Sequence, residues 1–237
     1  MLSGRQVLKF SIFIPLLLLS PAYCRCEFTG FPAQKYIEQL SSPTAEEKAQ
    51  AARILQNKMG TKHMPEAVGP LIKAMEDPSA DVRFAAATAL AQATDTRAFH
   101  PLIKALKDEE SSVRKAAAFA LGKFKNLQSV NALIPLTADE EPRVRWTTAF
   151  SLGKIKEKVS TSALIWMLKD EDPGVRSAAE YALGRMENKK AVGYLIETLT
   201  DSDVNVRGTA AKSLDKLTGE NIGENYHKWK EWQKKQP

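Results

Sequence analysis

The chain has 237 residues, with 34 Lys and Arg against 28 Asp and Glu, a formal net charge of +6 and 43% hydrophobic residues. This balance excludes a disordered tail protein and a polytopic membrane protein. The two cysteines, Cys24 and Cys26, are too few for a disulfide scaffold or a Cys-rich zinc module. The His, Cys and carboxylate residues form no recognised metal or nucleophile motif. We therefore expect no metal, no cofactor and no catalytic residue.

Residues 1–24 have the layout of a secretory signal peptide: a basic start, an apolar run over 10–19, and small or turn residues after it. The apolar run is shorter than the ~20 residues that span a bilayer. Cleavage fits after Ala22 or after Cys24. A lipid anchor on Cys24 fits poorly because Tyr23 precedes it, and an uncleaved anchor is a further alternative. We expect a periplasmic or secreted protein with no stable membrane span after cleavage.

The rest of the chain repeats with a period of 31 residues. An arginine recurs at this interval, with valine directly before it, aspartate six residues before it and leucine seven residues after it. The arginines are Arg83, Arg114, Arg145, Arg176 and Arg207. The aspartates are Asp77, Asp108, Asp139, Asp170 and Asp201. Four columns kept in five copies without an insertion predict a repeat architecture.

Each unit has the pattern of two helices. The first carries apolar residues at i, i+3, i+4 and i+7, as in 99–106, which is one face of an α-helix. The second has its N-cap four residues before the arginine, with Ser79, Asp172 and Asp203 as favourable caps. A column just after this helix is expected to end it in the left-handed conformation. The residues of that column are Asn126, Asn188 and Gly219.

A helix pair of this size buries its apolar face only against neighbouring pairs, so the fold class is all-α, a right-handed α-solenoid of about six helix hairpins. The array is expected over 25–217, with a degenerate first repeat at 31–57 and the period of 31 from about residue 66. The segment 218–237 is expected to cap it through a helix that carries Tyr226, Trp229 and Trp232 on one face. Pro135 falls inside a first helix, which it should kink or break.

The strings Asp…Val-Arg-x-x-Ala-Ala-x-Ala-Leu-Gly, best kept in 108–122 and 170–184, resemble HEAT-like repeats of the short type first described in phycobilisome lyases. The resemblance extends from Phe31 to about Leu217. It implies the solenoid fold but says little about function, because the family includes adaptor scaffolds, bilin lyase subunits, deoxyhypusine hydroxylase and alkylated-DNA glycosylases. The His-Glu pairs that bind iron in the hydroxylase are absent here.

The arginine and aspartate columns are interpreted as structural. A side chain repeated at every step builds a ladder rather than a site. Each arginine is expected to bond the loop carboxylate of its own or a neighbouring unit.

The second helix of each pair, which lines the concave side of HEAT-type stacks, carries the candidate binding residues. Positions one and five residues after the arginine share one helical stripe. Its aromatic members are Phe84, Phe119, Trp146, Phe150 and Tyr181. A cationic row, nine residues after the arginine, includes Lys123, Lys154 and Arg185. Because Val, Ala and Leu fill the core columns, we expect these aromatic rings to be exposed and to bind a partner.

These patterns favour a non-catalytic protein–protein interaction scaffold that binds a protein or peptide on this aromatic and basic face. The alternative is a lyase-type enzyme or enzyme subunit that holds a chromophore or flat cofactor there. That alternative needs an acid or nucleophile, and the repeats offer only exposed lysines and Glu180. Nucleic-acid binding is disfavoured by the modest charge and the signal-like N-terminus.

Overall fold

The computed structural model describes residues 31–60 and 63–236. The predicted signal segment 1–24 lies outside these residues. The described part contains thirteen α-helices and short 3-10 helices, with no strand. From Pro32 onward it forms one compact unit.

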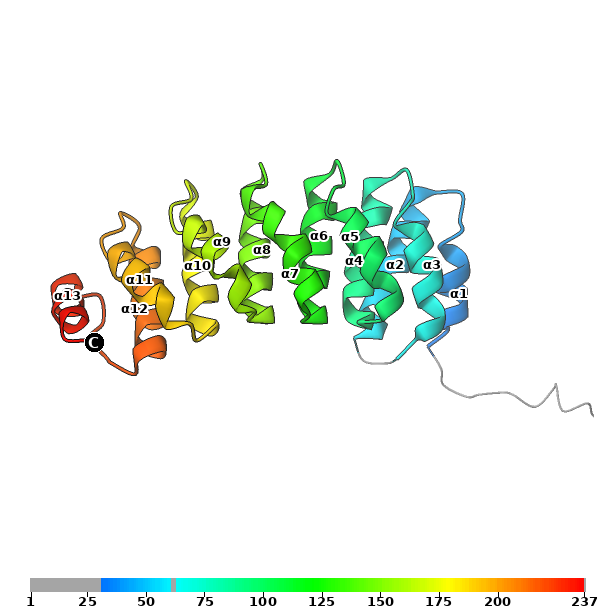
Figure 1. Ribbon diagram of the computed structural model, residues 1–237. Helices are drawn as coiled ribbons and strands as arrows, with labels where there is room; N and C mark the ends of the chain where they lie inside the picture. Colours follow the sequence, from blue (N-terminus) through cyan, green and yellow to red (C-terminus); the bar gives the residue numbers. More distant parts are fainter. Residues whose placement is uncertain (1–30, 61–62, 237) are drawn as a thin grey trace, which may run out of the picture. The chain divides into compact units, whose positions relative to one another are not determined.

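Twelve of the helices form six consecutive hairpins and the last stands alone (Figure 1). The hairpins are α1 (Ala33–Gln39) with α2 (Ala45–Met59), α3 (Val68–Ala74) with α4 (Ala80–Ala93), α5 (Phe99–Ala105) with α6 (Ser111–Phe124), α7 (Leu127–Leu133) with α8 (Pro142–Ile155), α9 (Thr161–Met167) with α10 (Pro173–Arg185), and α11 (Val192–Thr198) with α12 (Val204–Thr218). The final helix is α13 (Tyr226–Lys234). The all-α array of about six hairpins with a C-terminal helix is therefore confirmed.

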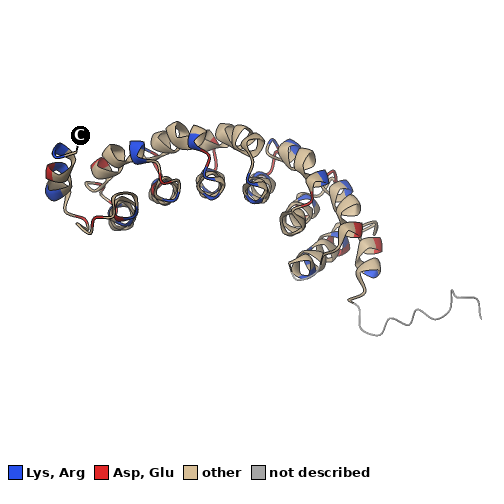
Figure 2. Cartoon of the chain, turned by 60° about the horizontal axis from the view of Figure 1, so that its bottom comes forward, with Lys and Arg blue, Asp and Glu red and all other residues tan. Residues whose placement is uncertain are grey.

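The hairpins stack as two layers. The second helices contact one another in the order α2, α4, α6, α8, α10, α12. Each first helix except α7 packs mainly on its own second helix, and α7 is joined to α8 mostly through the 3-10 helix over Ile134–Ala138. The second helices, upright in Figure 1, are seen nearly end-on in Figure 2, where they form the inner row of the curved array. The core between the layers is filled by the leucine column and by alanines. The members of that column, all fully buried, are Leu90, Leu121, Leu152, Leu183 and Leu214.

Glycines allow the second helices to approach closely. Gly122, Gly153 and Gly184 occupy one column of α6, α8 and α10. A Cβ atom built on Gly153 would lie 2.6 Å from the Cα of Ala182, which belongs to the α10 backbone. Since real Cβ atoms do not come this close to backbone, only glycine fits here without a shift of one helix.

Gly153→Ala is therefore expected to destabilise the protein by about 1–3 kcal/mol through overpacking. This reverses the usual sign, because alanine in a helix interior is about 1 kcal/mol better than glycine. The matched control is Gly69→Ala, a helical site with no atom within 4 Å of the added Cβ. Urea unfolding of the two variants tests the prediction, and equal stability of both would contradict it.

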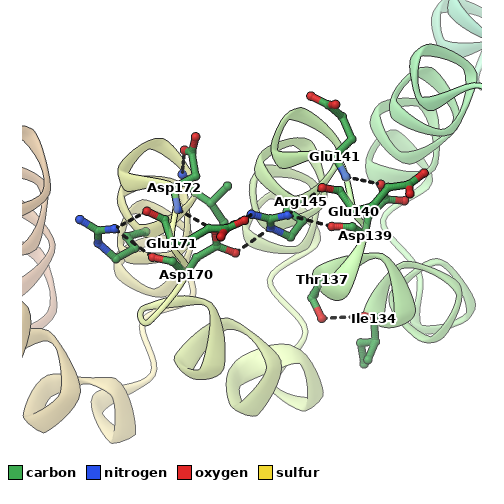
Figure 3. A network of polar contacts seen from close by, with 11 residues as sticks. Ile134, Thr137, Asp139, Glu140, Glu141, Arg145, Asp170, Glu171 and Asp172 are labelled. Carbon is green, nitrogen blue, oxygen red and sulfur yellow. Dashed lines mark hydrogen bonds and ion pairs between the residues drawn. The ribbon is translucent and has the colours of Figure 1, made fainter.

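A ladder of ion pairs joins successive repeats. Arg145 donates from Nε and Nη2 to both carboxylate oxygens of Asp170 in the next repeat, at 2.7 and 2.8 Å, and from Nη1 to the carbonyl oxygens of Asp139 and Glu140 in its own loop (Figure 3). The corresponding pairs are Arg83–Asp108, Arg114–Asp139 and Arg176–Asp201. The structural interpretation of the two columns is thus confirmed, with the carboxylate coming from the neighbouring unit.

The ladder changes at both ends. In the first repeat Lys48 replaces the arginine and its Nζ lies 2.7 Å from Asp77. At the other end Arg207 has no further aspartate to bind, and its Nε lies 3.6 Å from Glu224. Beyond it, α13 packs on α11 and buries Trp229, whose Nε1 donates to the carbonyl oxygen of Gly223 at 2.8 Å. This confirms the predicted apolar cap.

Two details of the predicted helix ends are wrong. Asn126 and Asn188 are not left-handed; their side chains cap the next elements by accepting from the N–H groups of Ser129 and Lys190. The left-handed residues stand one position earlier and include Lys125, and of the predicted column Gly219 alone has a positive φ, +81°. The reason is that α12 is one residue longer than α6 and α8.

The Ser79 side chain also makes no capping hydrogen bond. The ladder aspartate binds the N-cap residue itself, because Asp77 Oδ1 accepts from the N–H of Ser79 at 2.9 Å. Asp172 and Asp203 do cap their helices as expected.

Pro135 ends an α-helix, as predicted. α7 stops at Leu133 and the chain continues as a 3-10 helix over Ile134–Ala138. The Thr137 hydroxyl donates to the carbonyl oxygen of Ile134 at 2.8 Å and satisfies that acceptor in the tighter turn (Figure 3).

Candidate partner-binding surface

The predicted aromatic stripe lies on the exposed side of four consecutive second helices. Phe119 on α6, Trp146 on α8 and Tyr181 on α10 are 37%, 44% and 42% exposed. Phe84 on α4 and Phe150 on α8 are partly exposed. The five rings therefore lie outside the core between the layers, as the sequence analysis expected. Their role in binding stays a prediction.

Three of the rings form one continuous stack. Trp146 and Phe150 have ring centroids 5.6 Å apart with planes inclined by 6°, and Phe150 and Tyr181 are 6.2 Å apart at 4°. The stack thus extends from α8 to α10. Such stacking was not foreseen from the sequence, although the i, i+4 spacing of Trp146 and Phe150 permits it. Phe84 has no ring contact with the other four.

The three predicted cations lie against these rings. The Nζ atoms of Lys123 and Lys154 are 5.5 and 5.8 Å from the centroid of the same ring, Phe119. Lys123 Nζ also donates to Gln92 Oε1 at 2.8 Å. The Arg185 guanidinium lies 5.7 Å from the Tyr181 ring centroid and donates to the Tyr181 hydroxyl at 3.1 Å. These are cation–π distances, so the positive charges and the aromatic rings form one surface.

Positive charge on this surface is not neutralised by the protein's own carboxylates. In the described part of the chain, none of Lys123, Lys154 and Arg185 has a carboxylate oxygen within 4.0 Å, whereas Lys104 and Lys230 elsewhere form ion pairs. Burial lowers the pKa of Lys123, and the nearby charge of Lys154 acts in the same direction. The ammonium groups of Lys123 and Lys154 therefore repel each other while both lie against the apolar ring of Phe119. We define the aromatic surface as Phe84, Phe119, Trp146, Phe150, Tyr181, Lys123, Lys154 and Arg185.

Glu180, the acid available to a lyase-type activity, is absent from the aromatic surface. It lies on α10 and is completely buried. It falls in a core column whose other members are Ala87, Ala118, Ala149 and Ala211. Burial raises its pKa to about 8. Neither carboxyl oxygen has a hydrogen-bond partner among the described residues, since the nearby Thr198 hydroxyl donates to the carbonyl oxygen of Leu195.

Two further searches concern residues 31–60 and 63–236 only. They contain no group of three or more His, Cys, Asp or Glu side chains placed to hold a metal ion. None of their helices combines the length and the apolar character that crossing a membrane requires.

The fold and its stacked hairpins define an α-solenoid repeat protein. The family model for HEAT repeats matches residues 33–112, 99–184 and 161–221. The chain therefore belongs to the HEAT-repeat family. The comparison with curated proteins found no match.

Solved structures share the fold at low sequence identity. The complex of CpcE and CpcF of phycocyanin lyase from Nostoc sp. PCC7120 matches with a TM-score of 0.61 at 23% identity, over 86% of this chain and 82% of that chain. A designed armadillo repeat protein in complex with the peptide (KR)4 matches with 0.61 at 20%, over 79% and 100%. An engineered protein matches with 0.61 at 20%, over 81% and 100%. These likenesses show the fold, a solenoid built from stacked helix pairs.

Proposed function

We propose that this chain is a non-catalytic interaction module that binds a protein or peptide partner on the aromatic surface. The main support is the Trp146–Phe150–Tyr181 stack. These rings stay partly exposed on helices whose opposite sides pack into the core. Exposed apolar clusters of this kind mark interaction sites. Rings already held by stacking lose little conformational entropy on binding, so they are suited to be anchors.

The structural neighbours allow both of the functions considered from the sequence. One is a designed scaffold whose structure contains a peptide, and another belongs to a phycocyanin lyase. The present chain favours peptide binding over a lyase-type activity, because Glu180 is buried in the core and the aromatic surface carries cations in place of an acid.

We also propose that the protein acts outside the cytoplasm, in the periplasm or as a secreted protein. The support is the signal-like composition of residues 1–24.

The test is affinity capture with Trp146→Ala/Phe150→Ala. The purified protein is immobilised, incubated with an envelope extract of the native cell, and the captured proteins are identified by mass spectrometry. The double variant is expected to lose the partner that the unmodified protein captures, because the stack supplies the apolar anchors. Its far-UV circular dichroism should not change, since both rings lie outside the core.

The matched control is Trp166→Ala. Trp166 lies on the first helix α9 and is 60% exposed, so its removal deletes an exposed tryptophan from the other layer. This variant should capture the partner normally. Undiminished capture by the double variant would rule out the aromatic surface.

A further inference from the structure

The cations of the aromatic surface are arranged one per repeat. Lys123, Lys154 and Arg185 occupy equivalent positions near the ends of α6, α8 and α10, 31 residues apart. Two of them share the Phe119 ring, and the third covers Tyr181 at the end of the stack. The row of charges therefore runs along the array beside the rings, across three second helices.

We propose that the ligand of this surface is an extended acidic peptide segment, whose carboxylates bind successively to Lys123, Lys154 and Arg185 while its backbone passes along the aromatic stack. This inference rests on the proposed function and specifies the partner's chemistry. Its basis is charge complementarity: three cations lie together without an internal carboxylate, two of them repelling each other over one ring. A carboxylate bound to each ammonium group would offset that repulsion, and the Arg185 guanidinium can bind a carboxylate in a bidentate manner.

The distance between neighbouring second helices determines how far apart the acidic residues of the peptide must lie. Packed helices lie ~8–10 Å apart. A polyproline II segment rises about 3.1 Å per residue with three residues per turn, so every third side chain recurs on one side after about 9 Å. A peptide with an acid at every third position can therefore present one carboxylate to each repeat.

The probe follows from this geometry. It is a fluorescein-labelled peptide of four Glu-Ala-Pro tripeptides, and its binding to the full-length protein is measured by fluorescence anisotropy at 50 mM and 300 mM NaCl. Comparison peptides carry Gln or Lys in place of every Glu. We expect the acidic peptide to bind at least tenfold more tightly than either comparison peptide at low salt, and to lose most of this advantage at high salt through screening.

The decisive variants each remove two positive charges, one variant from the aromatic surface and the other from loops away from it. Lys123→Gln/Lys154→Gln should weaken binding of the acidic peptide about tenfold or more. Lys107→Gln/Lys169→Gln removes the same charge from two exposed loop positions after first helices and should leave the affinity within about twofold.

The outcomes separate this inference from the function on which it rests. Equal loss in both double variants would show only a general charge effect and would overturn the inference. Tighter or equal binding of the Gln or Lys peptide, abolished by Trp146→Ala/Phe150→Ala, would overturn the acidic ligand but retain the interaction module. Failure of every peptide to bind would also reject the acidic segment, while the capture experiment above would still decide the function.

Discussion

Replacing Arg145 by alanine should lower the free energy of unfolding by about 3–5 kcal/mol, the range found when one partner of a buried ion pair is removed. Its side chain is 8% exposed and that of Asp170 is 4% exposed. The variant loses three bonds to the next repeat, two to Asp170 and one to Glu171, and the two bonds to its own loop. It also leaves the Asp170 carboxylate buried opposite no cation. Guanidinium unfolding monitored by circular dichroism measures the effect.

Arg207→Ala is the control that isolates the bond between repeats. Arg207 donates to the loop carbonyl oxygens of Asp201 and Ser202 as its counterparts do, but it has no aspartate of a further repeat. Its nearest carboxylate oxygen is 3.6 Å away, on Glu224. The loss should therefore be clearly smaller than for Arg145→Ala. Equal losses would mean that the bonds within the loop, and not the ladder, carry the stability.

Glu180→Gln should stabilise the protein above neutral pH and abolish a pH dependence of its stability. Burial raises the Glu180 pKa from 4.5 to about 8, so between these values the folded state holds a proton that the unfolded state has lost. The stabilising contribution is complete below pH 4.5 and is lost as the pH rises to about 8. The free energy of unfolding should thus fall by about 1.4 kcal/mol per pH unit over this window.

The measurement is urea unfolding of both proteins at pH 5, 6, 7 and 8. The glutamine variant should match the unmodified protein most closely at pH 5 and exceed it most at pH 8. Glu231→Gln, at an exposed position of α13, should keep the slope of the unmodified protein. A slope that survives in Glu180→Gln would show that other groups cause it. Glu180→Ala, which restores the residue of the other four repeats, provides a second variant if the buried amide is poorly tolerated.

The architecture could be predicted because the same residue pattern recurs in several repeats. A weak helical pattern in one repeat is supported by the corresponding positions of the others. The arginine and aspartate columns likewise predicted their ion pairs, since two oppositely charged residues that recur in every repeat can pair in every repeat. Sequence alone left open which repeat supplies the carboxylate, because Asp139 and Asp170 occupy the same position in consecutive repeats and either could face Arg145.

Features that occur once were harder to predict. The left-handed residue after α4, α6, α8 and α10 is Thr, Lys or Glu, so composition gave no sign of it, and the more suggestive Asn126 and Asn188 serve as caps. Glu180 places a carboxyl group in an alanine column, and the column itself is the signal that could have placed it in the core. The ring stack needed coordinates, because it depends on how two neighbouring helices are rotated.

From the Arg–Asp ladder we expect the array to be unequally stiff along its length. Four bidentate pairs join the repeats from α4 to α12, while a single lysine contact and a 3.6 Å pair stand at the two ends. The helices that carry the stacked rings and their cations all belong to this middle section. We therefore expect the proposed partner to conform to the solenoid there, and any adjustment of the array to occur at the terminal hairpins.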